Sequence, residues 1–285
     1  MKNTSKGQRI FSTLNLLFLL LLAATMIVPM INVLAVSFTG RMESYENTIK
    51  LFPRHPSLSG YETLFKQVAI LRPFMNNVWV TVTGTFLHII LCSMAGYVLV
   101  RNRFFGKTFL VLLLTIPMMI PFQMIIIPVY VTMKNLGLMD TLTSLILIGV
   151  VSTFSIMLMK NFFEGIPVSL EESALIDGAS EFSIFFRIFL PLAKPGIATI
   201  GIFEFVNRWN QFLPAVLFIN SPPKYTLQIA LRSLVVNQEV TSTTQQVANN
   251  TRMAGIVLSV IPLLCIYVFA QKYFIEGIMV GAVKE

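Results

Sequence analysis

Long apolar runs divide the sequence into pieces that are long enough to cross a membrane. A bilayer-spanning helix needs about 20 mostly apolar residues, and five runs of about that length contain no Asp, Glu, Lys or Arg. A sixth apolar run is interrupted by Lys194, Glu204 and Arg208, and the third run contains three prolines that are expected to bend its helix. The pattern predicts an all-α polytopic membrane protein in which residues 1–285 form one transmembrane domain. Its six spans are expected near residues 12–36, 74–100, 108–133, 141–160, 190–219 and 253–272.

Composition supports the membrane class and narrows the chemistry. Of the 285 residues, 55% are hydrophobic and 12% are charged, whereas soluble domains carry about 25% charged residues. The net charge of +8 comes from basic residues spread over separate connections. Because nucleic-acid binding needs a continuous basic patch, no nucleic-acid partner is expected. Cys92 and Cys265 lie apart in apolar runs, which indicates neither a disulfide framework nor a metal site.

Positive charges near the span ends predict the orientation, because Lys and Arg concentrate on the cytoplasmic side of membrane helices. The N-terminal segment and the connection 101–107 each carry three basic residues and no acidic one. Both lie on one side if six spans alternate, so the chain is expected to have its N- and C-termini in the cytoplasm. The first apolar run is longer than the 7–15-residue core of a cleavable signal and is interpreted as a retained span. The six basic residues are Lys2, Lys6, Arg9, Arg101, Arg103 and Lys107.

An acidic stretch lies between the fourth and fifth predicted spans, in a cytoplasmic loop at 161–189. Ser169 followed three residues later by Glu172 predicts a capping box that starts a short helix after Pro167. Gly178 suits the left-handed residue that ends such a helix, and a second helix is expected from near Ser180. An ordinary connecting helix needs only these caps, but a short exposed helix with carboxylates also suits docking to a soluble partner. Five of the 13 acidic residues fall within 18 positions here, namely Glu164, Glu171, Glu172, Asp177 and Glu181.

This segment resembles the cytoplasmic EAA loop of ABC-importer permease subunits in the pattern Glu172-x-Ala174-x3-Gly178-x9-Ile188-x-Leu190-Pro191. Ser173 stands where that family usually has Ala, and both residues are small. The stretch WNQFLPAVLFI (209–219) and the tail FAQKYFIEGIMVGAVKE are similar to those of carbohydrate permeases of the maltose-transporter type, although Glu285 replaces a final Gly. The resemblance covers roughly residues 70–285 and favours the branch that transports oligosaccharides or polysaccharides.

The resemblance implies a multi-subunit importer in the bacterial cytoplasmic membrane. Two ABC ATPase subunits would bind ATP and Mg, a second homologous permease subunit would complete the pore, and an extracytoplasmic solute-binding protein would deliver a sugar. This chain would bind no cofactor, and it has no GxxxxGK[ST] motif, so it is not expected to be an enzyme. The tail Val280–Glu285 is a weaker second contact for the ATPase. Within the 169–191 coupling loop, the residues implied in ATPase coupling are Glu171, Glu172, Ser173, Ala174, Asp177, Gly178, Ile188, Leu190 and Pro191.

Polar residues inside the predicted spans are candidates for the transport path, because ionisable groups are costly in a membrane. Glu204 and Arg208 are one helical turn apart, so they form either a mutually neutralising pair or part of a polar wall. Asn76 and Gln123 are also compatible with bonding to nearby backbone, and His88 is expected to be a packed neutral histidine. The candidate path comprises Asn76, Gln123, Glu204, Asn207, Arg208, Trp209, Asn210 and Gln211.

Two other classes of protein remain as alternatives. An ion-coupled secondary carrier or channel would favour intramembrane acids, and in the predicted spans Glu204 is such an acid but has Arg208 nearby. An intramembrane enzyme would need a motif such as HExxH or GxSxG, and neither occurs in the sequence. The identity of the sugar is open: external Arg232 and Arg252 would suit an acidic glycan, but such residues also suit a docking binding protein.

Overall fold

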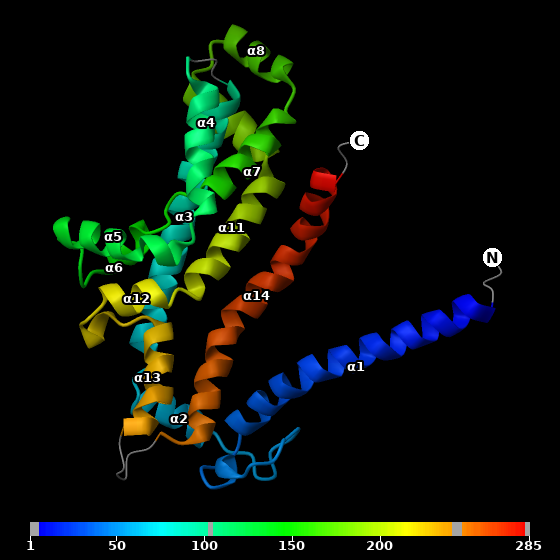
Figure 1. Ribbon diagram of the computed structural model, residues 1–285, viewed down its shortest axis with the longest axis vertical. Coiled ribbons are helices and arrows are strands. Elements are labelled where there is room, and N and C mark those ends of the chain that lie inside the picture. The colour runs from blue at the N-terminus through cyan, green and yellow to red at the C-terminus, as the bar shows by residue number, and fades with distance from the viewer. Residues whose placement is uncertain (1–5, 102–104, 241–246, 283–285) are drawn as a thin grey trace. The chain divides into compact units, whose positions relative to one another are not determined.

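The computed structural model describes residues 6–101, 105–240 and 247–282, and the regular elements in these ranges are helices (Figure 1). Contacts divide the chain into two compact units. Unit 1 comprises Met1–Ile70 and Leu231–Pro262, and unit 2 comprises Leu71–Ala230 and Leu263–Glu285. Lys2 and Arg103, used above to predict the orientation, lie outside the described residues, as do residues 283–285 of the tail.

Polar side chains organise the connection that follows the first helix of unit 1. Asn250 donates to the Thr39 carbonyl at 2.9 Å and so ties the connection to the last helix of the chain. The Glu43 carboxylate accepts the backbone N–H groups of Arg54, at 3.0 Å, and His55, and these bonds hold the pKa of Glu43 below its ordinary value. The helices of this unit are α1 (Lys6–Ser37), η1 (Glu43–Tyr45), α2 (Ser59–Lys66), the end of α13 (Leu227–Val240) and the first part of α14 (Asn249–Ala282).

Three of the described helices are long and apolar enough to cross a membrane, Ile10–Ser37, Leu71–Arg101 and Asn249–Val268. Two further pairs of consecutive helices would each count as one span if the two helices of the pair cross the membrane together despite the bend between them. Lys107–Met119 meets Phe122–Asn135 at 104°, and Glu181–Leu192 meets Lys194–Trp209 at 81°. The described residues therefore form an all-α protein with three to five candidate spans, and the arrangement with six stays a prediction.

Prolines break the third predicted span, 108–133. The helix α4 (Lys107–Thr115) leads into η2 (Ile116–Met119), which contains Pro117, and α5 (Phe122–Asn135) begins directly after Pro121. Proline has no N–H to continue the helical hydrogen bonds, so the chain bends sharply here. The expected bend is confirmed at these two prolines, whereas Pro128 lies inside α5.

The fourth and fifth predicted spans, 141–160 and 190–219, are not continuous helices. Gly149 interrupts the fourth with a φ of +69°, and the Ser152 side chain then accepts the Ser155 N–H to start a new helix. Apolar composition hides such local stop and start signals, so the predicted span ranges do not include these breaks. The observed helices are α6 (Leu142–Leu147) with α7 (Thr153–Glu164), and α11 (Lys194–Trp209) with α12 (Leu213–Phe218).

Unit 2 is organised around α3 (Leu71–Arg101), which packs along α7 and α11 (Figure 1). Glycines allow these helices to approach closely. A Cβ on Gly96 would lie 3.0 Å from the Lys160 backbone nitrogen, and a Cβ on Gly196 would lie 2.6 Å from the Phe162 ring. At the end of α3 near Arg101, an aromatic core cluster contains Tyr97, Phe163, Phe185 and Phe189.

The helix α8 (Val168–Ile176) lies at one end of unit 2, whereas α5, α6 and α12 lie toward the other end (Figure 1). This arrangement separates the two groups of residues singled out in the sequence. The remaining helices of the unit are α9 (Glu181–Ile184), η3 (Phe185–Phe189, a π-helix), α10 (Leu190–Leu192) and η4 (Pro222–Lys224).

Candidate functional site

The EAA segment, residues 165–191, contains a short helix that is fixed at its C-terminal end by backbone geometry. Gly178 has a φ of +75° and donates to the Leu175 carbonyl at 3.0 Å, while Ala179 donates to the Ala174 carbonyl at 2.9 Å. This pair of bonds is a Schellman motif, which satisfies the last carbonyls of α8 and favours glycine at the left-handed position. The predicted stop at Gly178 is confirmed.

The start of α8 differs from the prediction. The helix begins at Val168, with Pro167 before it, and no side chain caps its first turn. Ser169 lies inside the helix, where its carbonyl accepts the Ser173 hydroxyl at 2.8 Å. The predicted capping box is therefore wrong, because the helix starts two residues earlier, with Pro167 at its N-cap position instead of Ser169. The next helix does begin as expected, since the Ser180 side chain accepts the Ser183 N–H.

The surface of α8 is both apolar and acidic. Glu172, Ser173, Asp177 and Gly178 are exposed, as are four apolar side chains of the same helix. Ile176, for example, is 86% exposed. Exposed apolar patches of this kind mark contact surfaces. The four apolar side chains are Val168, Leu170, Leu175 and Ile176.

Glu171 is the exception among the predicted docking residues. It is 3% exposed and forms an ion pair with Arg101, the last residue of α3. The guanidinium of Arg101 also lies over two rings, 5.6 Å from the centre of Phe189 and 5.9 Å from that of Tyr97. Glu171 therefore anchors α8 to the rest of unit 2 instead of facing solvent.

Tyr97 makes a second anchor one helical turn before Arg101. Its hydroxyl donates to the Glu181 carboxylate at 2.7 Å, and its ring packs edge-on against Phe189 at 5.0 Å. Neither Tyr97 nor Arg101 was predicted from the sequence to be part of the site. Their four-residue spacing at the end of an apolar helix was the available signal, but the partner carboxylates are set by tertiary structure.

Of the last three predicted coupling residues, Ile188 lies in the π-helix η3, and Leu190 and Pro191 lie in α10. Ile188 and Leu190 pack against the aromatic core cluster, while Pro191 is exposed. Pro191 lies inside α10, and the chain breaks two residues later at the buried Ala193, after which α11 sets off at 81°. The EAA segment is thus joined to α11 through a packed bend.

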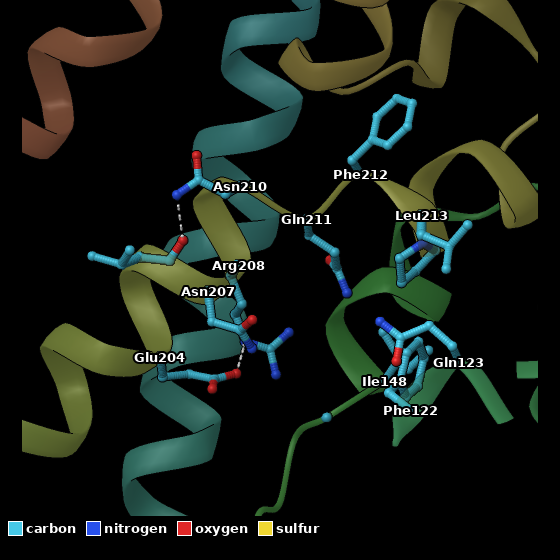
Figure 2. Close-up of a pocket in the computed structure, with 13 residues that line it drawn as sticks. Phe122, Gln123, Ile148, Glu204, Asn207, Arg208, Asn210, Gln211, Phe212 and Leu213 are labelled. Carbon is cyan, nitrogen blue, oxygen red and sulfur yellow. Dashed lines mark hydrogen bonds and ion pairs between the residues drawn. The ribbon is translucent and has the colours of Figure 1, made fainter. Parts of the chain in front are cut away.

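A cavity of about 690 Å³, called the polar cavity for the six charged and amide side chains in its wall, lies beside the C-terminal end of α11 (Figure 2). Figure 2 shows Glu204, Asn207 and Arg208 on one side of it and Gln123 and Ile148 on the other. Six of the eight predicted path residues line this cavity, namely Gln123, Glu204, Asn207, Arg208, Asn210 and Gln211. A volume of this size is typical of a small-molecule site.

Arg208 contacts two helices, its own helix α11 through Glu204 and the end of α6 through two backbone carbonyls. Its Nε lies 2.6 Å from Glu204 Oε1, and its Nη1 donates to the carbonyls of Leu145 at 3.1 Å and Ile146 at 3.0 Å. These carbonyls belong to the last turn of α6, where a helix leaves acceptors unsatisfied and favours positive charge. Arg208 therefore seals the break between α6 and α7, and Glu204 neutralises it.

His88 supports the same break from α3. Its ring nitrogens lie 3.2 Å from the Gly149 carbonyl and 2.8 Å from the Ser155 hydroxyl, and Nδ1 is 3.7 Å from Glu204 Oε1. His88 is fully buried, as expected for a packed histidine. Its packing is polar, however, because the interrupted backbone at Gly149 needs a partner.

Asn76 and Trp209 are not part of the polar cavity. Asn76 donates to the carbonyls of Pro223 and Tyr225, at 3.0 and 2.9 Å, so it fits the local backbone role. Trp209 is 1% exposed and packs between the rings of Phe74 and Phe205.

Comparison with known proteins fits a membrane helix bundle of this kind. Residues 88–280 match the family described as "Binding-protein-dependent transport system inner membrane component". The chain belongs to this family. The match includes the whole EAA segment and the wall of the polar cavity on α11, so both features lie within the part of the permease that the family shares.

Relatives of this permease are similar along nearly their full length. Protein LplC of Bacillus subtilis (strain 168) is 36% identical, with 100% of this chain and 98% of that protein covered. The "Polygalacturonan/rhamnogalacturonan transport system permease protein YtcP" of the same organism is 37% identical, with 97% and 99% covered. An arabinooligosaccharides transport permease, AraQ of Halalkalibacterium halodurans, is 33% identical, with 90% of each chain covered. The predicted resemblance to permease subunits of carbohydrate importers is confirmed by these relatives.

Solved structures support the same fold. A chain in the crystal structure of "a bacterial ABC transporter involved in the import of the acidic polysaccharide alginate" aligns with a TM-score of 0.88 at 27% identity, covering 96% of this chain and all of that one. A second alginate transporter structure, in complex with an "alginate pentasaccharide-bound periplasmic protein", aligns at 0.61 with 16% identity and 93% of each chain covered, which supports the fold alone.

Proposed function

We propose that the chain is the permease subunit of a binding-protein-dependent ABC importer that carries a sugar or oligosaccharide into the cytoplasm. The observation that carries the proposal is the EAA segment, a short helix with an exposed apolar and acidic surface that is fixed to the membrane helices. Two partner ATPase subunits dock on α8 and bind ATP and Mg. Their closure on ATP moves α8, and the packed bend at Ala193 passes that movement to α11.

The assembly follows from the family. This chain pairs with a second homologous permease subunit, spans the bacterial cytoplasmic membrane six times with both termini inside, and receives its solute from an extracytoplasmic binding protein. Three features support the arrangement: the three to five candidate spans, the description of the family as an inner membrane component, and the occurrence of the relatives in bacteria.

The solute is an oligosaccharide, and the polar cavity lies on its path. The relatives named for a substrate transport polygalacturonan, rhamnogalacturonan or arabinooligosaccharides. The two charged residues of the cavity wall, Glu204 and Arg208, neutralise each other. The other polar groups of the wall are amides, which both donate and accept hydrogen bonds and so suit sugar hydroxyls. The amide residues are Gln123, Asn207, Asn210 and Gln211.

The docking role is tested by Gly178→Asp in the reconstituted complex. An aspartate at a φ of +75° strains the backbone and adds a charge to the contact surface, so we expect the solute imported per ATP to fall about tenfold or more. The matched control is Gly137→Asp, because Gly137 has a φ of +69° and equally open surroundings but lies outside the EAA segment. Normal coupling in Gly178→Asp would contradict the proposal.

Two further measurements separate the alternatives. Uptake by vesicles that lack the ATPase subunits, driven by an ion gradient, would show a carrier instead of an ABC permease. ATPase stimulation by the cognate binding protein, measured with neutral and acidic oligosaccharides, identifies the solute class. If the cavity lies on the path, Gln211→Leu and Asn207→Leu change the ranking of these sugars, whereas a uniform loss for all of them would indicate a purely structural role.

A further inference from the structure

Two side chains of α3 hold the two sides of the docking helix. Arg101 forms an ion pair with Glu171 in α8, and Tyr97 donates to Glu181 just after α8. Because the two α3 residues are one helical turn apart, they point to the same face of α3. The EAA segment is therefore bonded to α3 at two points, through the Glu171 carboxylate within α8 and through the Glu181 carboxylate at the start of α9.

The Arg101 contact is built as an anchor, not as a surface ion pair. The side chains of Arg101 and Glu171 are 14% and 4% exposed, and two aromatic rings flank the guanidinium. Exposed ion pairs contribute little, whereas the loss of one partner of a buried pair leaves an uncompensated charge. Separating α8 from α3 would therefore cost more free energy than breaking an exposed ion pair, so the two helices are expected to move together.

Apolar packing of α8 is slight by comparison. Among the described residues of α8, Ala174 packs against the aromatic core cluster, while four larger apolar side chains are exposed. The ion pair is thus the stronger link between α8 and α3.

The helix α3 also contacts two residues that line the polar cavity, Glu204 and Arg208. Gly84 of α3 lies against the Arg208 guanidinium, and His88 of α3 contacts Glu204 at 3.7 Å. A movement imposed on the Arg101 end of α3 is therefore delivered to the residues that seal the break beside the cavity.

We propose that Arg101, assisted by Tyr97, is a positioning residue that transmits the pull on α8 directly into α3, in parallel with the covalent route through Pro191 into α11. This inference rests on the proposed docking of ATPase subunits on α8. Without the anchor, α8 still binds the ATPase, but its movement reaches α11 alone.

The test uses the complete reconstituted complex with its partner permease, ATPase subunits and binding protein. Arg101→Glu places two carboxylates together and is expected to lower the solute imported per ATP about tenfold, while ATP hydrolysis continues. The exchanged pair Arg101→Glu with Glu171→Arg restores opposite charges and is expected to recover the ratio to within about threefold of the wild type. Tyr97→Phe removes only the hydroxyl and should lower the ratio about two- to threefold.

The matched control is Glu164→Arg, which reverses an exposed carboxylate of α7 that pairs with Lys160 and should leave the ratio unchanged. A wild-type ratio in Arg101→Glu, or an assembled exchanged pair that does not recover, would overturn the inference. If Arg101→Glu does not assemble, Tyr97→Phe decides, and a wild-type ratio there overturns it. Gly178→Asp in the same complex separates the two proposals: if it uncouples and Arg101→Glu does not, the anchor is wrong and the docking stands.

Discussion

Two arginine–glutamate pairs lie largely out of solvent in the described part of unit 2, and they have different structural roles. Glu204 and Arg208 lie four residues apart on one helix, and Arg208 also bonds to two carbonyls at the end of α6. Glu171 and Arg101 come from α8 and α3, and Arg101 packs against aromatic rings. The first pair repairs a broken backbone inside one packed region. The second joins the short helix α8 to the long helix α3.

The comparison teaches that burial of an ion pair does not fix its role. Breaking the Glu204–Arg208 pair leaves a charge and two carbonyls without partners, so the cost falls on stability. Breaking the Arg101–Glu171 pair frees one end of a short helix near the surface, so the cost falls more on coupling than on stability. Four substitutions measure this difference.

Arg208→Met should have the largest effect on stability. The buried Glu204 carboxylate and the carbonyls of Leu145 and Ile146 lose their partner, which should cost about 3 to 5 kcal/mol. The thermal unfolding temperature of the purified protein in detergent measures this loss. Arg208→Met combined with Glu204→Gln removes both charges and should recover part of it, and an unchanged unfolding temperature in the single variant would show that the pair does not seal the break.

Arg101→Met should destabilise the protein less, by about 1 to 3 kcal/mol, because its side chain is 14% exposed and lies at a helix end. Limited proteolysis should show α8 cut faster, while the unfolding temperature falls less than in Arg208→Met. If Arg101→Met is instead the more destabilising of the two, the proposed division between a structural and a transmitting pair is wrong.

Gly84→Ala sharpens the account of Arg208. A Cβ on Gly84 would lie 2.6 Å from Arg208 Cζ, so the guanidinium must move, at a cost of about 1 to 2 kcal/mol. In an Arg208→Met background the same change should cost nothing or stabilise α3, because alanine has the higher helix propensity. Equal costs in both backgrounds, measured by unfolding temperature, would show that the two residues do not interact.

Asp140→Asn should have the smallest effect, seen as a change in pH dependence. The Ser221 hydroxyl and N–H and the Lys224 ammonium hold the pKa of Asp140 well below its usual range. Because the folded pKa is depressed, the stabilisation is present above the unfolded value of about 3.9 and is lost as the pH falls below it. The unfolding temperature of the wild type should therefore fall toward that of the variant as the pH is lowered from about 5 to 3, and the remaining difference is lost as the pH falls through the depressed folded pKa.

The asparagine variant is matched to the wild type in its backbone. Asp140 has a φ of +56°, a conformation that asparagine also tolerates. A constant gap between the two unfolding temperatures over this pH range would contradict the predicted linkage. This half-buried pair should show a smaller effect than the two more deeply buried arginine–glutamate pairs.

Some of the site was visible in local sequence because its cause is local. The stop at Gly178 follows from the left-handed backbone that glycine favours, and the Glu204–Arg208 pair follows from helical spacing. The grouping of six path residues around one cavity was expected in outline, because five of them share α11 and the turn after it. Gln123 joined them only through the bend at Pro117 and Pro121.

Other parts required the three-dimensional fold. Local pattern predicted a capping box at Ser169 and an exposed Glu171, but Arg101 takes Glu171 into the interior and Pro167 starts the helix earlier. Composition predicted a span at 141–160 but not its division into two helices by Gly149 and Ser152. Hydropathy averages over such breaks and therefore cannot detect them.

The sequence by itself determined the class of an α-helical membrane protein and the helix stop at Gly178, because span length, apolar composition and glycine placement act over a few neighbouring residues. The tertiary structure decided that Glu172 is exposed while Glu171 pairs with Arg101 of α3, and that Arg208 bonds to the end of α6. The physical reason is that a buried charge takes its role from the groups that surround it, and those groups come from segments that only folding brings together.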